Sequence, residues 1–248
     1  MRLTTAPAHL GTDPLPDVWE PGTARPHLWA VRVTEYATRA SAQEHLLDGE
    51  ERARCQGFAR PADRDRYRVA HVALRRLLGA YLDRDPAAVP FVREPCPGCG
   101  APHGRPAVPG APLHFSLSHA GDVVLLAFAG APVGVDVEEE PSAEVAAEVA
   151  AMLHPAERAE VAGLPLPARP SAVNRCWARK EAYLKGVGIG LGEDPSVTYV
   201  GTGTTPAAPH AWTLTDVACP PGYAAACAVR TANVGTGATG TGLGDRLR

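Results

Sequence analysis

Long apolar runs are missing from this sequence. No stretch approaches the roughly 18 consecutive apolar residues of a membrane-spanning helix, so we expect no membrane span. The first residues, Met1–Thr5, lack the long apolar core of a secretory signal peptide. Together these absences predict a protein of the cytoplasm.

An excess of basic charge is also missing. The 24 lysines and arginines are outnumbered by 27 aspartates and glutamates, which gives a net charge of −3. That balance lacks the basic footprint of a nucleic-acid-binding protein. The 248 residues are 45% hydrophobic and 21% charged, as in an ordinary globular protein. Such a chain can bury a sizeable core, as one large domain or two small ones.

Cysteines are few, and we expect them to be reduced in the cytoplasm. The six are Cys55, Cys96, Cys99, Cys176, Cys219 and Cys227. The pair Cys96-Pro-Gly-Cys99, with His103 and His114 nearby, supplies half of a structural zinc site, and no second such pair follows. Two interpretations stay open, a zinc site or a tight turn before Gly104. A redox role lacks the βαβ context that it would need.

The most informative segment is Trp177–Leu191, which predicts a helix that ends in glycines. At about 100° per residue, one face of about 140° collects Trp177, Lys180, Glu181, Leu184 and Lys185. An acid between two lysines suits a metal ion beside a polyanion. A salt bridge between Glu181 and Lys185, four positions apart, would explain the same pattern.

A second acidic site follows from the alternation in Val133–Glu138, which predicts a strand. Gly134, Asp136 and Glu138 share one face of that strand. Two acids on one face repel each other unless a cation or hydrogen-bond donors lie between them. A strand that simply ends in the acidic loop Glu139-Glu140 is the alternative. With Glu181, the two acids would make the hard oxygen ligand set that Mg²⁺ prefers.

Gly134-Val-Asp-Val-Glu138, followed some forty residues later by Trp177-x-x-Lys-Glu-x-x-x-Lys185, resembles the two signature motifs of the 4′-phosphopantetheinyl transferases. The resemblance extends from about Glu50 to Val229 and is nearest to the larger, monomeric type that serves nonribosomal peptide and polyketide synthases. It implies transfer of the phosphopantetheine arm of coenzyme A to a serine of an apo acyl or peptidyl carrier protein. Adenosine 3′,5′-bisphosphate is released.

The resemblance also assigns roles to residues of the two motifs. It implies that Asp136, Glu138 and Glu181 hold Mg²⁺, with Mn²⁺ as an alternative. Lys180 and Lys185 are similar to the family's phosphate-contacting lysines. Glu181 would also draw the proton from the carrier serine, directly or through water.

Further upstream, Ser118-His119 is similar to the family's Ser-x-Ser-His motif, whose histidine contacts a phosphate of coenzyme A. A histidine in a turn is the alternative, since Ala120-Gly121-Asp122 is a turn signal. Gly104-Arg105-Pro106 resembles a Gly-Lys-Pro element that lies against the adenosine end. Arginine in place of lysine keeps the charge and changes its geometry.

Arg66 falls on the apolar stripe of a predicted helix over 63–82, whereas Arg75 and Arg76 point elsewhere. A guanidinium facing the core needs an anionic partner. The resemblance supplies the 3′-phosphate of the nucleotide, and an internal Asp or Glu is the alternative. Glu157 matches a family glutamate near the site, although an acid in the first turn of a helix also stabilises that helix by itself.

The order of elements predicts an α+β fold of two similar halves. The first half, 1–131, has a strand at 28–34, helices at 42–54 and 63–82, and strands near 89–93, 113–118 and 123–129. The second half, 132–230, has a strand at 133–138, helices at 143–152, 155–162 and 171–186, and strands at 196–200, 211–217 and 223–229. The low-complexity residues 231–248 predict a flexible tail.

That order fits the family's pseudo-twofold pair of halves with the ligand in the cleft between them. We expect the carrier to dock through exposed apolar and basic residues beside the cleft, on the segment 139–152 and on the helix that ends near Lys185. The alternatives are a non-catalytic coenzyme A-binding protein, a different Mg²⁺-dependent enzyme acting on a pyrophosphate ester, and a zinc-stapled interaction module. The presence of all three acids disfavours the first, and the second would need the carboxylates without Arg66, Gly104–Pro106 and the Trp177 helix.

Overall fold

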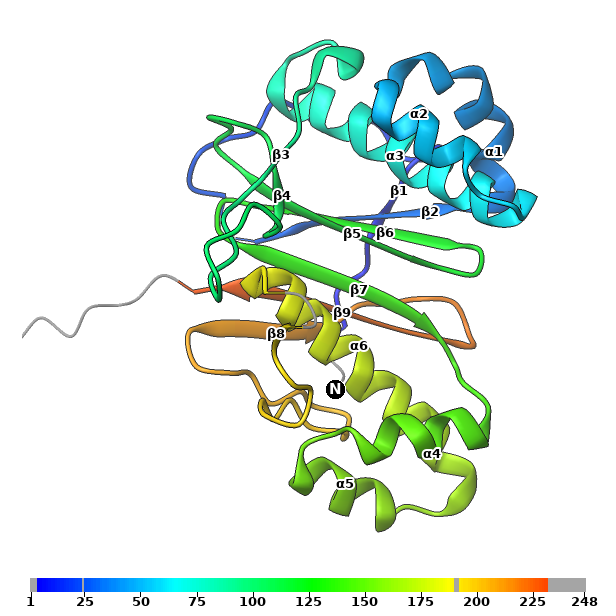
Figure 1. The fold of residues 1–248 in the computed structure, drawn as a ribbon, viewed down its shortest axis with the longest axis vertical. Helices are drawn as coiled ribbons and strands as arrows, with labels where there is room; N and C mark the ends of the chain where they lie inside the picture. The colour runs from blue at the N-terminus through cyan, green and yellow to red at the C-terminus, as the bar shows by residue number, and fades with distance from the viewer. Residues whose placement is uncertain (1–3, 24, 190–191, 232–248) are drawn as a thin grey trace, which may run out of the picture.

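Two β-sheets lie face to face, and helices cover the outer side of each (Figure 1). The computed structural model describes residues 4–23, 25–189 and 192–231. The predicted tail, 231–248, therefore lies outside the described residues except for Thr231. Within the described residues, no helix is both long and apolar enough to cross a membrane.

The first sheet has the strand order β1-β2-β6-β5, and the second has the order β7-β9-β8. Their strands are β1 (Ala8–His9), β2 (His27–Arg32), β5 (His114–Ala120), β6 (Val123–Ala129), β7 (Val133–Glu139), β8 (Trp212–Asp216) and β9 (Tyr223–Arg230). A separate antiparallel pair is formed by β3 (Val92–Arg93) and β4 (Pro106–Ala107). The strand after the turn 130–132 thus crosses to the second sheet instead of pairing with β6.

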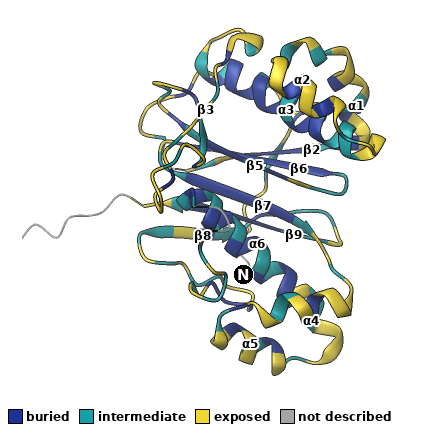
Figure 2. Cartoon of the chain, in the orientation of Figure 1, coloured by how far each residue is buried: buried dark blue, intermediate teal, exposed yellow. Residues whose placement is uncertain are grey.

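Both inner sheet faces are apolar, and they bury each other. Val133, Val135 and Val137 of β7 pack with Leu125 and Ala127 of β6 in one buried cluster. Alternation along each strand sends the intervening side chains to the helices on the outer side. Figure 2 shows the resulting burial, which is greatest on the strands and on the inward faces of the long helices.

The helices form two separate layers (Figure 1). They are α1 (Val33–Ala42), α2 (Gly49–Gln56), α3 (Pro61–Leu82), α4 (Ala143–Ala151), α5 (Pro155–Ala162) and α6 (Arg169–Val187), with short 3₁₀ turns η1 (Glu44–Leu46), η2 (Pro86–Ala88) and η3 (Leu166–Ala168). Helices α1 and α3 pack on the first sheet, with α2 against α3, and α6 packs on the second sheet, with α4 and α5 against α6. The observed elements confirm the predicted α+β class.

The strand expected at 28–34 is confirmed as β2, but it ends at Arg32, and helix α1, which was not predicted, begins at Val33. The helix expected at 42–54 is shorter, because α2 begins only at Gly49, after η1. The cap of α1 comes from far along the chain, because Thr34 donates to Asp122 from both its backbone nitrogen (2.7 Å) and its hydroxyl (3.0 Å). The strand expected at 196–200 is absent because Val200 N donates to the Glu157 carboxylate (2.7 Å) and not to a neighbouring strand.

Candidate active site

The two sheets meet at their edge strands, β5 and β7, through hydroxyl groups. Phe115 and Leu117 of β5 pack into the first core, so the alternate residues Ser116 and Ser118 face β7. Ser116 Oγ accepts a hydrogen bond from Val135 N (3.1 Å), and Ser118 Oγ donates to Asp136 Oδ1 (2.7 Å). These bonds satisfy groups that a sheet edge would otherwise leave unpaired.

Helix α6 approaches β7 unusually closely because of two glycines. A Cβ on Gly134 would overlap the Ala182 carbonyl oxygen and the Gly186 backbone nitrogen. A Cβ on Gly186 would lie 2.6 Å from the Trp212 ring. This contact sets Glu181 and Lys185 beside the polar face of β7, so the two sequence motifs meet in space.

Asp136 is the most buried acid of the group, with 1% of its surface exposed. Its Oδ1 accepts from Lys185 Nζ (2.5 Å) and from Ser118 Oγ. Its Oδ2 is buried without any hydrogen-bond partner. Burial raises the pKa of Asp136, although Lys185 and Ser118 lower it in part. An unpartnered buried carboxylate oxygen is costly for a protein and is a natural ligand for a hard cation.

Glu138 and Glu181 complete a group of three mutually repelling acids. Burial and the negative charge of Asp136 raise the pKa of Glu138 to about 7, and Glu181 adds to the effect. Burial and Asp136 also raise the pKa of Glu181. The three carboxylates therefore lie within electrostatic reach of one another. Their oxygens are not all within 4.8 Å of one another. Among the described residues, three potential metal-ligating atoms come that close at Cys96, Cys99 and His103.

Three cationic or ionisable groups line the same junction. Lys185 contacts Ser118 Oγ (3.0 Å) as well as Asp136. Desolvation by the surrounding protein lowers the pKa of His119, and the charges of Arg66, His71 and Lys185 lower it further. His119 thus lies within electrostatic reach of Arg66 on α3 and Lys185 on α6. Clustered positive charge of this kind is complementary to phosphate oxygens.

Arg66 has the internal acidic partner that the sequence left open as the alternative to a phosphate. Its Nε donates to the Gly121 carbonyl (2.8 Å) and its Nη1 pairs with Asp63 (2.9 Å), with 24% of the side chain exposed. The core-facing arginine of α3 is Arg75, which was expected to point elsewhere. It is buried against Asp48 and Glu51 because α2 covers that second face of α3.

Gly104, Arg105 and Pro106 lie where the loop before β4 reaches α6. Arg105 donates to the Gly186 carbonyl (2.8 Å) and pairs with Glu94 (2.6 Å). A Cβ on Gly104 would lie 2.6 Å from the Glu94 carbonyl oxygen, so only glycine fits there. This segment thus connects the first half to the C-terminal end of α6.

The prediction for Lys180 is corrected by its surroundings. Its ammonium pairs with Glu157 (2.7 Å) and donates to the Thr198 carbonyl (2.5 Å), and only 3% of its side chain is exposed. Glu157 is itself fully buried and also accepts from Val200 N. Sequence alone gave no sign of this pair, because its members come from different helices. Both residues tie α5, α6 and the loop near Val200 together.

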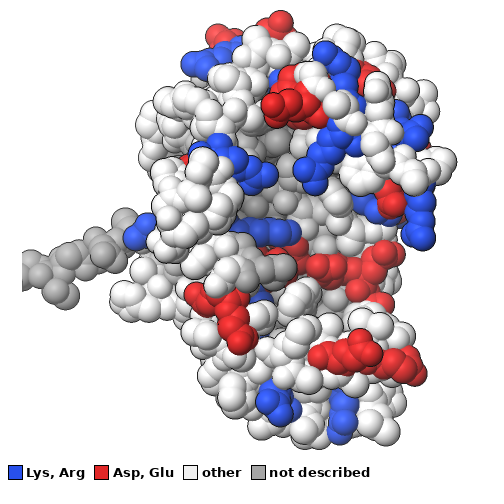
Figure 3. Space-filling model, viewed as in Figure 1, with Lys and Arg blue, Asp and Glu red and all other residues white. Residues whose placement is uncertain are grey.

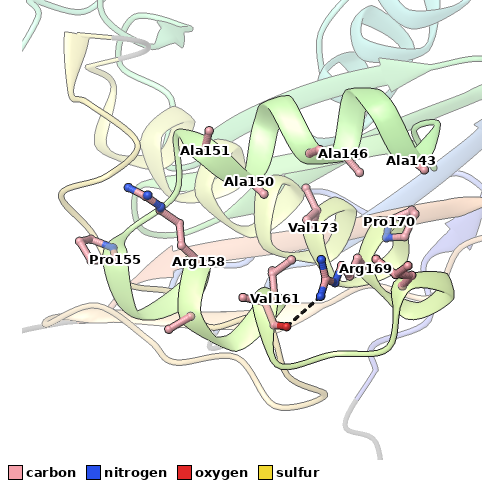
Figure 4. Close-up of a pocket in the computed structure, with 14 residues that line it drawn as sticks. Ala143, Ala146, Ala150, Ala151, Pro155, Arg158, Val161, Arg169, Pro170 and Val173 are labelled. Atoms are coloured by element: carbon pink, nitrogen blue, oxygen red, sulfur yellow. Dashed lines mark hydrogen bonds between the residues drawn. The ribbon is translucent and has the colours of Figure 1, made fainter.

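The face that carries the junction is hollowed between the two halves (Figure 3). Basic side chains gather on the upper side of the hollow and acidic ones on the lower side. A different recess, of about 810 Å³, lies among α4, α5 and the start of α6 (Figure 4). Its lining is largely alanine with Arg158 and Arg169, and it contains none of the three acids.

Comparison with known proteins agrees with this geometry. A family model described as the 4′-phosphopantetheinyl transferase superfamily matches residues 132–227. That range runs from β7 into β9 and holds all three acids and Lys185. This part of the chain, residues 132–227, therefore belongs to the superfamily.

Relatives within the superfamily match a longer part of the chain. A phosphopantetheinyl transferase of Thraustochytrium sp. is 32% identical over 189 residues, which cover 66% of this chain and 61% of that protein. The 4′-phosphopantetheinyl transferase HetI of a Nostoc species is 29% identical, over 82% of this chain and 86% of its own. The transferase Sfp of Bacillus subtilis is 24% identical over 63% and 69%, respectively.

Proposed function

We propose that this protein transfers the 4′-phosphopantetheine arm of coenzyme A to a serine of an apo acyl or peptidyl carrier protein. The reaction depends on Mg²⁺ and releases adenosine 3′,5′-bisphosphate. The observation that carries the proposal is Asp136, whose buried Oδ2 has no partner and whose neighbours are Glu138 and Glu181. Its membership of the superfamily supports the same chemistry.

The three acids suit a divalent cation. The three raised pKa values and the unpartnered Asp136 oxygen mark a site where negative charge exceeds what the protein itself neutralises. Asp136, Glu138 and Glu181 would hold Mg²⁺, or Mn²⁺, through oxygen ligands. When bound, the cation would neutralise charge on the diphosphate of coenzyme A.

The remaining groups of the junction fit the phosphates of coenzyme A. Lys185, His119 and Arg66 converge from α6, β5 and α3, and each can donate to phosphate oxygens. Ser118 orients Lys185 and Asp136 through its hydroxyl. Gly104, Arg105 and Pro106 would border the nucleotide end, although Arg105 is already paired with Glu94.

Glu181 is the proposed proton acceptor for the carrier serine, directly or through a water. Burial and Asp136 raise its pKa in the metal-free protein, whereas a bound cation would lower it, so a water beside the metal would share this task. The attacking hydroxyl would then reach the β-phosphate of coenzyme A. Position and charge neutralisation carry most of the catalysis in phosphoryl transfer.

The two halves, 1–131 and 132–230, are proposed to be related by an approximate twofold axis. The orders β2-β6-β5 and β7-β9-β8 match, since in both the first strand pairs with the last and the penultimate strand is outermost. This arrangement belongs to the larger, monomeric type of the superfamily. We therefore propose that the protein acts as a monomer in the cytoplasm.

The carrier is proposed to dock on α4, next to the acidic end of β7. Val145 and Met152 are each 47% exposed and lie seven positions apart, on one side of the helix. Two exposed apolar side chains in line offer a contact for an apolar helix face of a carrier. Glu139 and Glu140, which border the helix, would disfavour the most acidic carriers.

Intact mass spectrometry of an apo carrier protein tests the function. The carrier is incubated with coenzyme A, Mg²⁺ and the enzyme, with and without a chelator. We expect a mass gain equal to the phosphopantetheine arm that disappears with the chelator. Coenzyme A binding without any gain, on several unrelated carriers, would instead indicate a non-catalytic binding protein.

A further inference from the structure

A second cluster of metal-ligating side chains lies outside the proposed active site, in the loop between β3 and β4. Cys96 and Cys99 begin and end a tight turn, and His103 follows four residues after Cys99. The Cys96 and Cys99 sulfurs and a His103 ring nitrogen all lie within 4.8 Å of one another. Cys99 Sγ and His103 Nε2 are 3.0 Å apart.

The backbone of the loop holds these three side chains on one side. Gly100 N donates to the Cys96 carbonyl (2.8 Å), and Cys96 N donates to the Ala101 carbonyl (2.8 Å). Gly100 has a φ of +75°, a left-handed conformation that returns the chain toward Cys96 and favours glycine. The close approach of the three side chains is therefore built into the turn.

The backbone N–H groups of Cys99 and Gly98 donate hydrogen bonds to the Cys96 sulfur. Cys96 is buried, whereas Cys99 and His103 are exposed. A bound ion would thus sit at the surface, with one side open to solvent.

We propose that Cys96, Cys99 and His103 bind one zinc ion, with water as the fourth ligand. Two thiolates and an imidazole form a soft ligand set that selects zinc over Mg²⁺ or Ca²⁺. This set differs in chemistry from the three carboxylates, so the two sites would take different ions. The inference does not depend on the proposed transfer reaction.

Zinc at this position would fix the loop that carries Gly104 and Arg105. Arg105 joins the loop to the Gly186 carbonyl at the end of α6. The turn itself lies near the same helix end, because a Cβ on Gly98 would be 3.3 Å from the Ile189 side chain. The ion would therefore stiffen the contact between the two halves.

Metal analysis of the untagged full-length protein tests the proposal. Purified without chelator, the wild-type protein should retain about one zinc per chain after desalting. Cys99→Ser and His103→Gln should each lose at least about 10-fold in zinc affinity, because each removes one of three ligands. Cys219→Ser, which changes a half-buried cysteine elsewhere, is the matched control and should retain the zinc.

Cobalt substitution provides a second readout that does not depend on activity. Co²⁺ added to the metal-free wild-type protein should produce thiolate-to-cobalt absorption and tetrahedral d–d bands, and both variants should lose them. Because Cys99 and His103 are exposed, both variants should fold, and thermal unfolding of the variants checks this. The proposal is overturned if the zinc-incubated wild-type protein keeps no metal. It is also overturned if Cys96 and Cys99 are found as a disulfide in freshly purified protein.

Discussion

The chain has two lysines, Lys180 and Lys185, and their side chains have opposite roles. Lys185 contacts Asp136 and Ser118 at the junction of the halves. Lys180 is buried in an ion pair with Glu157. The sequence motif places both on one helix face, but five positions along a helix turn the side chain by about 140°. Two lysines of one motif thus separate into a candidate phosphate contact and a structural ion pair.

Replacing each lysine by methionine should separate these roles. Lys185→Met should lower the transfer rate by about 10²-fold, because a donor to the phosphates is removed. Lys180→Met should cost about 3–5 kcal/mol of unfolding free energy, since Glu157 would keep a buried, unpaired charge. Denaturant unfolding and transfer kinetics measure the two effects. If folded Lys180→Met shows a raised KM for coenzyme A, Lys180 contacts the substrate after all.

Glu138 makes the stability of the metal-free protein depend on pH. Its pKa in the folded protein is about 7, against an ordinary value of 4.5. The folded state therefore binds this proton more tightly than the unfolded state. The contribution to stability is complete below pH 4.5 and is lost as the pH rises through about 7.

Glu138→Gln should remove this dependence. With a chelator present at pH 8, the variant should be more stable than the wild-type protein by about 1–3 kcal/mol. At pH 4.5 the two should unfold alike, and transfer should fail in the variant at every pH. Glu148→Gln, an exposed acid on α4, is the control and should keep the wild-type pH profile. A Gln variant that is less stable at pH 8 would show that the Glu138 charge is already neutralised.

At the scale of elements, the contact between β7 and α6 decides whether the acids meet. Gly134 and Gly186 allow the two backbones to approach, as the absence of room for a Cβ demonstrates. Helix packing therefore requires a glycine at position 134, independently of the chemistry of Asp136 and Glu138.

Gly134→Ala should cost about 3 kcal/mol or more, because the added methyl group meets backbone atoms that cannot move aside. Gly163→Ala is the matched control, since a Cβ there would lie 3.5 Å from the nearest atom, and it should change stability by less than about 0.5 kcal/mol. Thermal unfolding compares the two. Equal stability of both variants would mean that α6 does not pack this closely on β7.

Most regular elements could be predicted from the sequence because their signals are local. The alternation in Val133–Glu138 and the glycines after the Trp177 helix gave β7 and α6 nearly at their observed bounds. Helix α1 could not be found this way, because its cap is Asp122, 88 positions away. The Glu157–Lys180 ion pair and the burial of Arg75 could not be predicted from local signals either. Each depends on a partner that only the tertiary fold brings near.

At the scale of the whole molecule, two edge strands and a close helix place residues of both halves around one junction. Arg66, Ser118 and His119 come from the first half, and the three acids with Lys185 come from the second. A ligand bound there would contact both halves, so each half alone would hold an incomplete site. The α4 surface beside the junction then offers a place for the second substrate.

Introducing charge on α4 should weaken carrier docking selectively. Val145→Glu and Met152→Glu should each raise the KM for the carrier protein by about 10-fold, because one apolar contact is replaced by a charge. The KM for coenzyme A should not change. Val18→Glu, at a residue that is 56% exposed on the N-terminal segment, is the control. Unchanged carrier kinetics in both α4 variants would place the docking surface elsewhere.

The binding of Mn²⁺ in the presence of coenzyme A, followed by the electron paramagnetic resonance signal of the free ion, tests the three-carboxylate site most directly. The wild-type protein should show one tight site that involves the oxygens of Asp136, Glu138 and Glu181. Asp136→Asn and Glu181→Gln should each bind Mn²⁺ at least about 10-fold more weakly, whereas Glu144→Gln should bind like the wild-type protein. Wild-type affinity in Glu181→Gln would contradict the convergence of the two motifs on one ion.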